Sequence, residues 1–156
     1  MDQTQTPVGR PAVSRPASSE RVGWTGLGVI ALGGGLGGLA RYALGVWAPT
    51  PPGSFPVTTF AINVSGCALI GCLMVVCTEL LPHRVLPRLF LGVGVLGGYT
   101  TFSLHVLEVQ QLLAYPAVAT AVLYLAGTVV AAITAVATGM AVTRWLIRLA
   151  RRRRSA

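Results

Sequence analysis

A stretch of glycines and polar residues interrupts one of the long apolar segments of this chain. Residues 97–105 read GGYTTFSLH, so two glycines are followed by hydroxylated residues and a histidine. Hydrocarbon offers no hydrogen-bond partner to a freed backbone group. A helix break at membrane depth is therefore tolerated only inside protein or beside a polar pathway. We expect residues 97–105 to form a broken helix at a functional site.

Composition places the chain in a lipid bilayer. Its 156 residues are 53% hydrophobic and 10% charged, with a mean hydropathy of +0.69. A soluble domain carries about 25% charged residues. Only four residues are acidic, which disfavours hydrolysis or proton pumping by paired carboxylates. No nucleophile or metal-ligand set accompanies either histidine, so we do not expect an enzyme.

The apolar segments predict an all-α membrane protein with four transmembrane helices, the third broken at its midpoint. The expected spans are roughly residues 24–47, 55–80, 88–113 and 117–147. Residues 1–22 are rich in proline, serine and threonine, which predicts a disordered cytoplasmic tail. The four-helix membrane domain would then cover residues 23–147, and residues 148–156 would form a basic cytoplasmic tail.

Arginine placement predicts the orientation of the chain. Eleven of the twelve arginines lie before the first span, between the second and third spans, or near the C-terminus. The other two loops carry none. The positive-inside rule therefore predicts a multi-pass protein of the cell membrane with both termini in the cytoplasm. We expect the C-terminal arginines to contact anionic lipid headgroups rather than nucleic acid.

Two polar side chains within the spans admit two interpretations each. Arg41, near the far end of the first span, either extends to the membrane interface or supplies a fixed positive charge that attracts anions or holds a loop. Asn63, in the second span, either hydrogen-bonds a neighbouring helix or binds a ligand of the protein. It shares one helical face with Thr59 and Gly66. Glu108 lies near the exit of the third span, where a carboxylate can reach the interface.

Glycine spacing predicts close helix packing. The sequence GxGxxG occurs at residues 33–38 and 92–97, but neither copy has the strand and acidic residue of a dinucleotide site. Pairs of glycines four residues apart let a neighbouring backbone approach closely. The candidate pairs are Gly33 with Gly37, or Gly34 with Gly38.

Three motifs over roughly residues 26–145 resemble the CrcB/Fluc family of fluoride channels. Residues 34–42 resemble a glycine-rich first helix that ends in Arg-Tyr, and residues 59–66 contain the Asn-x-x-Gly signature. Residues 97–103, followed by Glu108, resemble the Gly-Gly-x-Thr-Thr-Phe-Ser signature. The resemblance implies an antiparallel dimer of four-span subunits that exports fluoride and so reduces its toxicity in the cytoplasm.

The resemblance also implies roles for individual residues. Backbone carbonyls at Gly97 and Thr100 match those that hold a structural sodium ion (Na+) between two subunits, an ion that is not transported. Phe102 matches a pore phenylalanine whose positive ring edge faces the anion. Asn63 matches an amide donor to fluoride. The remaining matches are the hydroxyl track of Thr59, Tyr124 and Thr128, and the structural positions Arg41, Thr101, Ser103 and Glu108.

Two departures from the family pattern suggest an incomplete pore. His105 stands where a second pore phenylalanine is usual, and Ala132 stands where another hydroxyl is expected. An antiparallel homodimer requires one sequence to insert both ways, which the one-sided arginines oppose. We therefore expect a heterodimer with a related, oppositely oriented chain, and otherwise a homodimer. The alternative is a non-conducting or regulatory partner subunit.

A small multidrug exporter is a remote alternative. It would also be a dimer of four-span subunits. Such proton-coupled exporters need a membrane-embedded acid in the first helix. This sequence has no acidic residue between Glu20 and Glu79.

Overall fold

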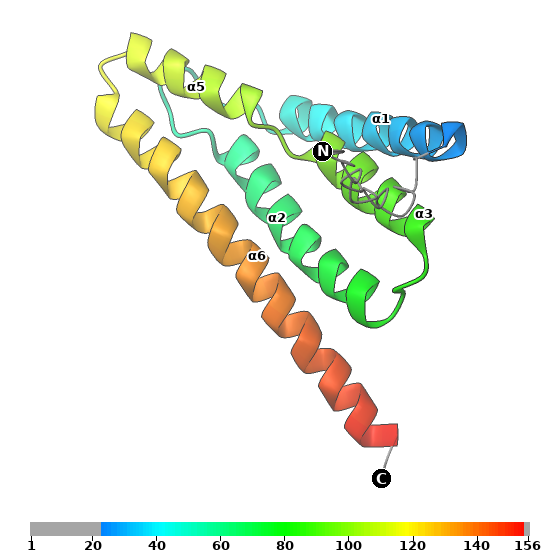
Figure 1. Cartoon of the computed structure of the whole chain (residues 1–156). Helices are drawn as coiled ribbons and strands as arrows, with labels where there is room; N and C mark the ends of the chain where they lie inside the picture. The colour runs from blue at the N-terminus through cyan, green and yellow to red at the C-terminus, as the bar shows by residue number, and fades with distance from the viewer. Residues whose placement is uncertain (1–22, 155–156) are drawn as a thin grey trace, which may run out of the picture.

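A computed structural model describes residues 23–154, and all of their regular structure is helical (Figure 1). Within these residues four helical spans are long and apolar enough to cross a membrane. They are Trp24–Trp47, Val57–Glu79, Val85–Ala114 and Val118–Arg153. The predicted fold class is confirmed. The tail predicted for residues 1–22 lies outside the described residues.

The third span is broken, as the sequence predicts. It consists of α3 (Val85–Pro87), a π-helical stretch η1 (Arg88–Leu96), α4 (Gly97–Tyr99) and α5 (Ser103–Ala114). Thr100 leaves the helix with φ −76° and ψ 155°, which is extended backbone. Pro87 is the third residue of α3. It is tolerated there because backbone N–H groups in a first turn have no helical partner.

The break carries the third span from one pair of helices to another. Its first half, η1 and α4, packs against α1 (Trp24–Trp47). Its second half, α5, packs against α6 (Val118–Arg154), which also packs along α2 (Val57–Glu79). Figure 1 shows α1 beside the first half of the span and α2 beside α6. A continuous helix could not pack against both α1 and α6 in this way, so the fold requires the break in the third span.

Glycines let α1 approach the third span at backbone distance. A Cβ on Gly33 would lie 2.6 Å from the Phe90 carbonyl oxygen, and one on Gly37 would overlap the Val95 carbonyl. Both glycines are buried. A Cβ on Gly98 would likewise overlap the Gly34 carbonyl. The glycine-rich segments therefore serve helix packing, as their spacing predicts.

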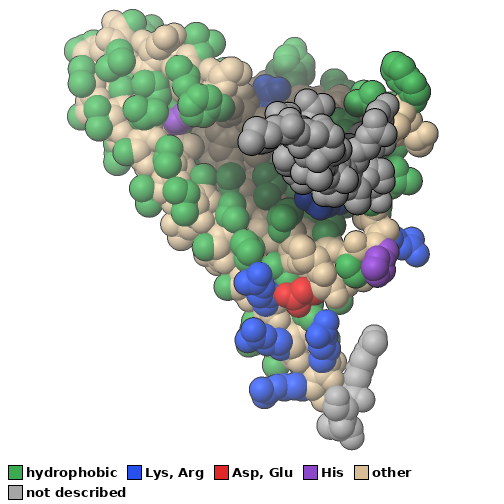
Figure 2. Space-filling model, viewed as in Figure 1, with side chains coloured by type: hydrophobic (Ala, Val, Ile, Leu, Met, Phe, Trp, Pro, Cys, Tyr) green, Lys and Arg blue, Asp and Glu red, His purple; other side chains and the backbone are tan. Residues whose placement is uncertain are grey.

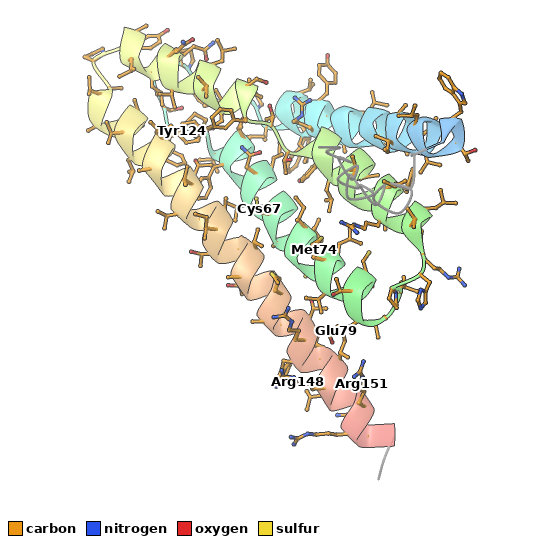
Figure 3. All side chains as sticks on the ribbon, in the orientation of Figure 1. Cys67, Met74, Glu79, Tyr124, Arg148 and Arg151 are labelled. Carbon is orange, nitrogen blue, oxygen red and sulfur yellow. The ribbon has the colours of Figure 1, made fainter. Side chains whose placement is uncertain are left out.

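Helix α6 is longer than the sequence interpretation anticipated. It has 37 residues and continues to Arg154, whereas about 20 residues suffice to cross the hydrocarbon. Near its C-terminal end, Arg144 Nε lies 3.4 Å from Glu79 Oε1 at the end of α2. Arginine side chains gather around this point in Figure 2, and Figure 3 places Arg148 and Arg151 near Glu79. The arginine-rich segments that follow α2 and end α6 thus share one end of the molecule.

We predict that Gly37→Ala destabilises the fold, whereas Gly28→Ala does not. The new methyl group at Gly37 must push apart two backbones, and overpacking of this kind costs about 1–3 kcal/mol. A methyl group added at Gly28 would point into open space, with nothing to meet within 4 Å, so alanine there should be neutral or slightly stabilising. Thermal unfolding of both variants in detergent measures the difference. Equal melting temperatures would contradict the packing role of Gly37.

Candidate functional site

The break in the third span is held by the side chain of Asn63. Asn63 Nδ2 donates to the Thr101 carbonyl oxygen at 2.9 Å, and the Thr101 N–H donates to Asn63 Oδ1 at 2.9 Å. The amide thus satisfies both backbone groups of one residue, as a neighbouring strand would. Asn63 is buried, and Gly66, one turn further along α2, contacts Thr100 and Tyr99. This face of α2 therefore supports the unwound segment.

Other side chains replace further helical hydrogen bonds at the break. Arg41 Nε donates to the Gly98 carbonyl oxygen at 3.1 Å. The Leu104 N–H donates to Thr101 Oγ1 at 3.3 Å, and Ser103 Oγ lies 3.4 Å from the same hydroxyl. Of the two interpretations for Arg41, the contact favours a fixed charge that holds backbone. Ser103 is the first residue of α5, and Thr101 lies two residues before it.

Two carbonyl groups lose their usual helical donors because of these bonds. In a continuous helix, the Thr101 N–H would bond the Gly97 carbonyl and the Leu104 N–H would bond the Thr100 carbonyl. Here the Thr101 N–H donates to Asn63 Oδ1 instead, and the Leu104 N–H donates to Thr101 Oγ1. The carbonyl oxygens of Gly97 and Thr100 are thus available to another ligand. Oxygen ligands of this kind suit a hard cation, so the residues present fit the sodium site that the family resemblance implies.

A cavity of 210 Å³ lies beside the break. It brings together four residues expected on the fluoride path: Asn63, Phe102, His105 and Thr128. Ala132 lines the same cavity, one turn beyond Thr128 on α6. The two aromatic positions differ in burial, because the Phe102 side chain is 75% exposed and His105 only 2%. In this chain the exposed Phe102 ring is therefore free to meet a second subunit.

His105 is buried without a hydrogen-bond partner. Within residues 23–154, neither Nδ1 nor Nε2 of its ring has one. The ring packs edge-on against Tyr124 at a centroid distance of 4.5 Å and lies 6.3 Å from the ring of Phe102. Buried polar groups are nearly always hydrogen-bonded, so an exception calls for an explanation such as a missing ligand or partner.

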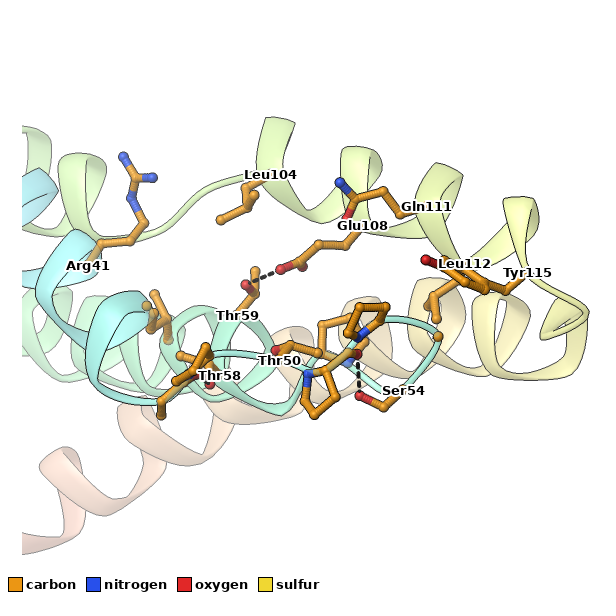
Figure 4. Close-up of a pocket in the computed structure, with 18 residues that line it drawn as sticks. Arg41, Thr50, Ser54, Thr58, Thr59, Leu104, Glu108, Gln111, Leu112 and Tyr115 are labelled. Atoms are coloured by element: carbon orange, nitrogen blue, oxygen red, sulfur yellow. Dashed lines mark hydrogen bonds between the residues drawn. The ribbon is translucent and has the colours of Figure 1, made fainter.

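Glu108 is the centre of a network that the sequence did not reveal. Thr59 Oγ1 donates to Glu108 Oε1 at 2.7 Å, and the Tyr124 hydroxyl donates to Glu108 Oε2 at 2.5 Å. Figure 4 shows Thr59 and Glu108 pointing toward each other from α2 and α5. The carboxylate therefore bridges three helices, α5, α2 and α6. The sequence feature that pointed to a role for Glu108 is that a lone acidic residue within a membrane span is expected to be functional.

A second, larger pocket opens beside this network (Figure 4). It measures 510 Å³ and is lined by Arg41, Thr59 and Glu108 together with residues 48–54 and Tyr115 of the two arginine-free loops. It thus lies at the end of the bundle opposite the arginine-rich end. One cationic and one anionic side chain face it, and the loops around it are uncharged.

Tyr124 connects the two hollows. Its hydroxyl binds Glu108, which faces the loop-side pocket, and its ring packs on His105, which faces the cavity at the break. One turn later, Thr128 Oγ1 donates to the Tyr124 carbonyl oxygen at 2.7 Å. Polar groups therefore run from the loop end of the bundle to its centre. Such a row could accept a small ion that has shed its water.

Comparisons with known proteins identify the family of this chain. Residues 28–140 match the family model described as "CrcB-like protein, Camphor Resistance (CrcB)". A "Fluoride-specific ion channel FluC 2" of Nocardia farcinica is 50% identical over 79% of this chain and 88% of its own length. A "FluC 1" of Streptomyces coelicolor is 48% identical over 83% of this chain and 86% of its own length. Streptomyces avermitilis has two such relatives, named FluC 2 and FluC 3.

We predict that Asn63→Ala loosens the break, whereas Ser65→Ala has little effect. The first change leaves the Thr101 N–H and carbonyl unpaired in a partly buried place, at a cost of up to about 1–3 kcal/mol for each group. The second removes an exposed 3.2 Å contact between Ser65 Oγ and the Tyr99 hydroxyl, and a 3.1 Å hydrogen bond from Ser65 Oγ to the Ile62 carbonyl oxygen of its own helix. Thermal unfolding and amide hydrogen exchange at Thr101 provide the measurement. If both variants behaved alike, Asn63 would not be the support of the break.

Proposed function

The chain belongs to the CrcB family, and we propose that it is a subunit of a fluoride-specific ion channel in the cell membrane. The relatives named above are ion channels, not enzymes. The channel would release fluoride from the cytoplasm and so limit its toxicity. Both termini would lie in the cytoplasm, because the arginine-rich end is the cytoplasmic end under the positive-inside rule.

The cavity at the break is the observation that carries this proposal. A fluoride ion holds its water tightly, so a pore must offer hydrogen-bond donors in exchange. Most hydroxyls near the path already donate to protein groups, namely those of Thr59, Tyr124 and Thr128. Asn63 donates one amide hydrogen to the Thr101 carbonyl oxygen. Its side-chain NH2 group carries a second hydrogen that can be donated to another acceptor. Together with an N–H of His105, this amide supplies donors for an anion in the cavity.

Phe102 and the hydroxyl track extend this path. The positive edge of an aromatic ring attracts an anion without the penalty of a full charge. Phe102 lines the cavity next to Asn63. Thr59, Tyr124 and Thr128 would pass the ion toward the loop-side pocket by exchanging their present acceptors for fluoride. Glu108 would orient the hydroxyls of Thr59 and Tyr124, while Arg41 would offset its negative charge at the mouth.

A structural sodium ion would complete the centre of the assembly. Carbonyl oxygens of Gly97 and Thr100 from two subunits would hold it, and only unwound backbone presents carbonyls at this depth. The ion would supply a fixed positive charge that lowers the cost of an anion nearby. Ser103 and Thr101 would stabilise the backbone turn that presents these oxygens.

We further propose that the assembly is an antiparallel heterodimer. The one-sided arginines favour a single orientation for this chain, so its partner would be a related chain with the opposite bias. The two unpartnered nitrogens of His105 support a site that another chain completes. The two relatives found together in one Streptomyces species show that one organism can carry more than one such chain. A non-conducting, regulatory subunit is the second candidate, favoured by the same histidine.

Fluoride efflux from liposomes tests the channel and the heterodimer together. We expect this chain alone to give weak efflux and the pair with its related chain to give strong efflux, measured with a fluoride electrode. Strong efflux from the chain alone would exclude an obligate heterodimer but retain the fluoride channel. Absence of efflux from every combination would exclude the fluoride channel.

We expect His105→Phe to raise the efflux of the chain alone by about two- to tenfold, since an added aromatic edge is worth about 0.5–1.5 kcal/mol. Leu107→Phe is the matched control, because its side chain is on the same helix and exposed. It adds the same ring away from the cavity and should leave efflux unchanged. An unchanged rate in both variants would count against an incomplete pore in this chain.

Sodium binding has a readout that does not depend on transport. We expect the melting temperature of the assembled protein to rise with sodium concentration, as for any ligand of the folded state. The comparison replaces sodium chloride with N-methylglucamine chloride at equal ionic strength. If the two salts gave the same melting temperature, the carbonyls of Gly97 and Thr100 would not hold sodium.

A further inference from the structure

A third hollow lies at the arginine-rich end, far along the bundle from the loop-side pocket. It measures 350 Å³, a size typical of ligand sites. It lies between the end of α2 and the beginning of the third span. The lining residues are Met74, Cys77, Thr78, Leu81, Pro82, Arg84, Val85 and Arg88. None of them belongs to the proposed fluoride path.

The lining combines cationic and apolar groups. Arg84 and Arg88 bring two guanidinium groups, and Thr78 brings a hydroxyl. Within residues 23–154, the ion pair found at this end joins Arg144 to Glu79 and involves neither Arg84 nor Arg88. The other lining side chains are mostly apolar, and the pocket is partly open, since Met74 and Val85 are 41% and 49% exposed. A ligand with one anionic and one apolar part therefore suits the pocket.

Its position selects a membrane lipid as that ligand. The pocket lies where α2 leaves the apolar region, next to the loop that joins two membrane spans. Arginine side chains also gather at this end in Figure 2. Lipid phosphates occupy this depth of a bilayer, and basic pockets between membrane helices bind anionic headgroups. Arginine is suited to this task because its planar fork bonds two phosphate oxygens at once.

We propose that this pocket binds the phosphodiester headgroup of an anionic phospholipid. Arg84 and Arg88 contact the phosphate. The Thr78 hydroxyl, which donates to the Met74 carbonyl oxygen at 2.8 Å, lines the pocket beside them. Met74, Leu81 and Val85 contact the adjoining acyl chain. The site is independent of fluoride conduction. It fixes the loop between the second and third spans to the membrane surface.

The test compares two double variants of the full-length protein. Arg84→Gln/Arg88→Gln removes the pocket charges, and Arg148→Gln/Arg152→Gln removes the same charge from α6. Delipidated protein is titrated with phosphatidylglycerol or phosphatidylcholine, and bound lipid is counted by native mass spectrometry. We expect the pocket variant to bind phosphatidylglycerol about 30-fold more weakly. The α6 variant should lose much less affinity, because its arginines contact headgroups at the open surface and not in a pocket.

Three outcomes would overturn the proposal. The first is equal phosphatidylglycerol binding by both double variants, and the second is equal binding of the two lipids by the unmodified protein. The third is stabilisation by inorganic phosphate as strong as that by phosphatidylglycerol, which would assign the pocket to a free anion. Arg88→Lys keeps the charge but loses the planar fork. It provides an intermediate test if the double variant does not fold, and affinity equal to the unmodified protein would exclude bidentate binding.

Discussion

The paired hydrogen bonds between Asn63 and the backbone of Thr101 are the interaction on which this structure depends. A helix cannot stop inside a membrane unless its freed backbone groups find new partners. Asn63 provides a donor and an acceptor at one place, so the third span can unwind for a few residues. The unwinding then releases the carbonyls of Gly97 and Thr100 and opens the cavity beside Phe102.

The glycines of the first span make the break possible at the level of the whole bundle. Gly33 and Gly37 bring α1 into backbone contact with the first half of the third span, which leaves its second half to follow α6. Close-packed backbones have little freedom to shift. The position of the break is therefore set by packing on both sides. Arg41, whose guanidinium bonds the Gly98 carbonyl, adds a third support from α1.

A polar connection between distant parts of the bundle follows from this framework. Glu108 sits on the half-span that packs against α6, where the Tyr124 hydroxyl meets it, and α2 brings Thr59 from the other side. Tyr124 in turn covers His105. One carboxylate thus links the loop-side pocket to the cavity at the break. Within residues 23–154, the buried imidazole of His105 has no hydrogen-bond partner.

The sequence by itself determined the spans, the break and the glycine contacts, because hydropathy, helix-breaking residues and small-residue spacing act locally along the chain. It could not assign partners to Asn63 or Glu108, whose roles as a backbone support and as a network centre came from the tertiary structure. Those partners are 38 and 49 residues away in the sequence. A hydrogen bond depends on distance and angle between two groups, and only the packing of α2, α5 and α6 fixes these. The local sequence pattern therefore specifies where the third helix breaks, because glycines and polar residues act on the backbone next to them. The tertiary structure decides which side chains replace the lost helical hydrogen bonds.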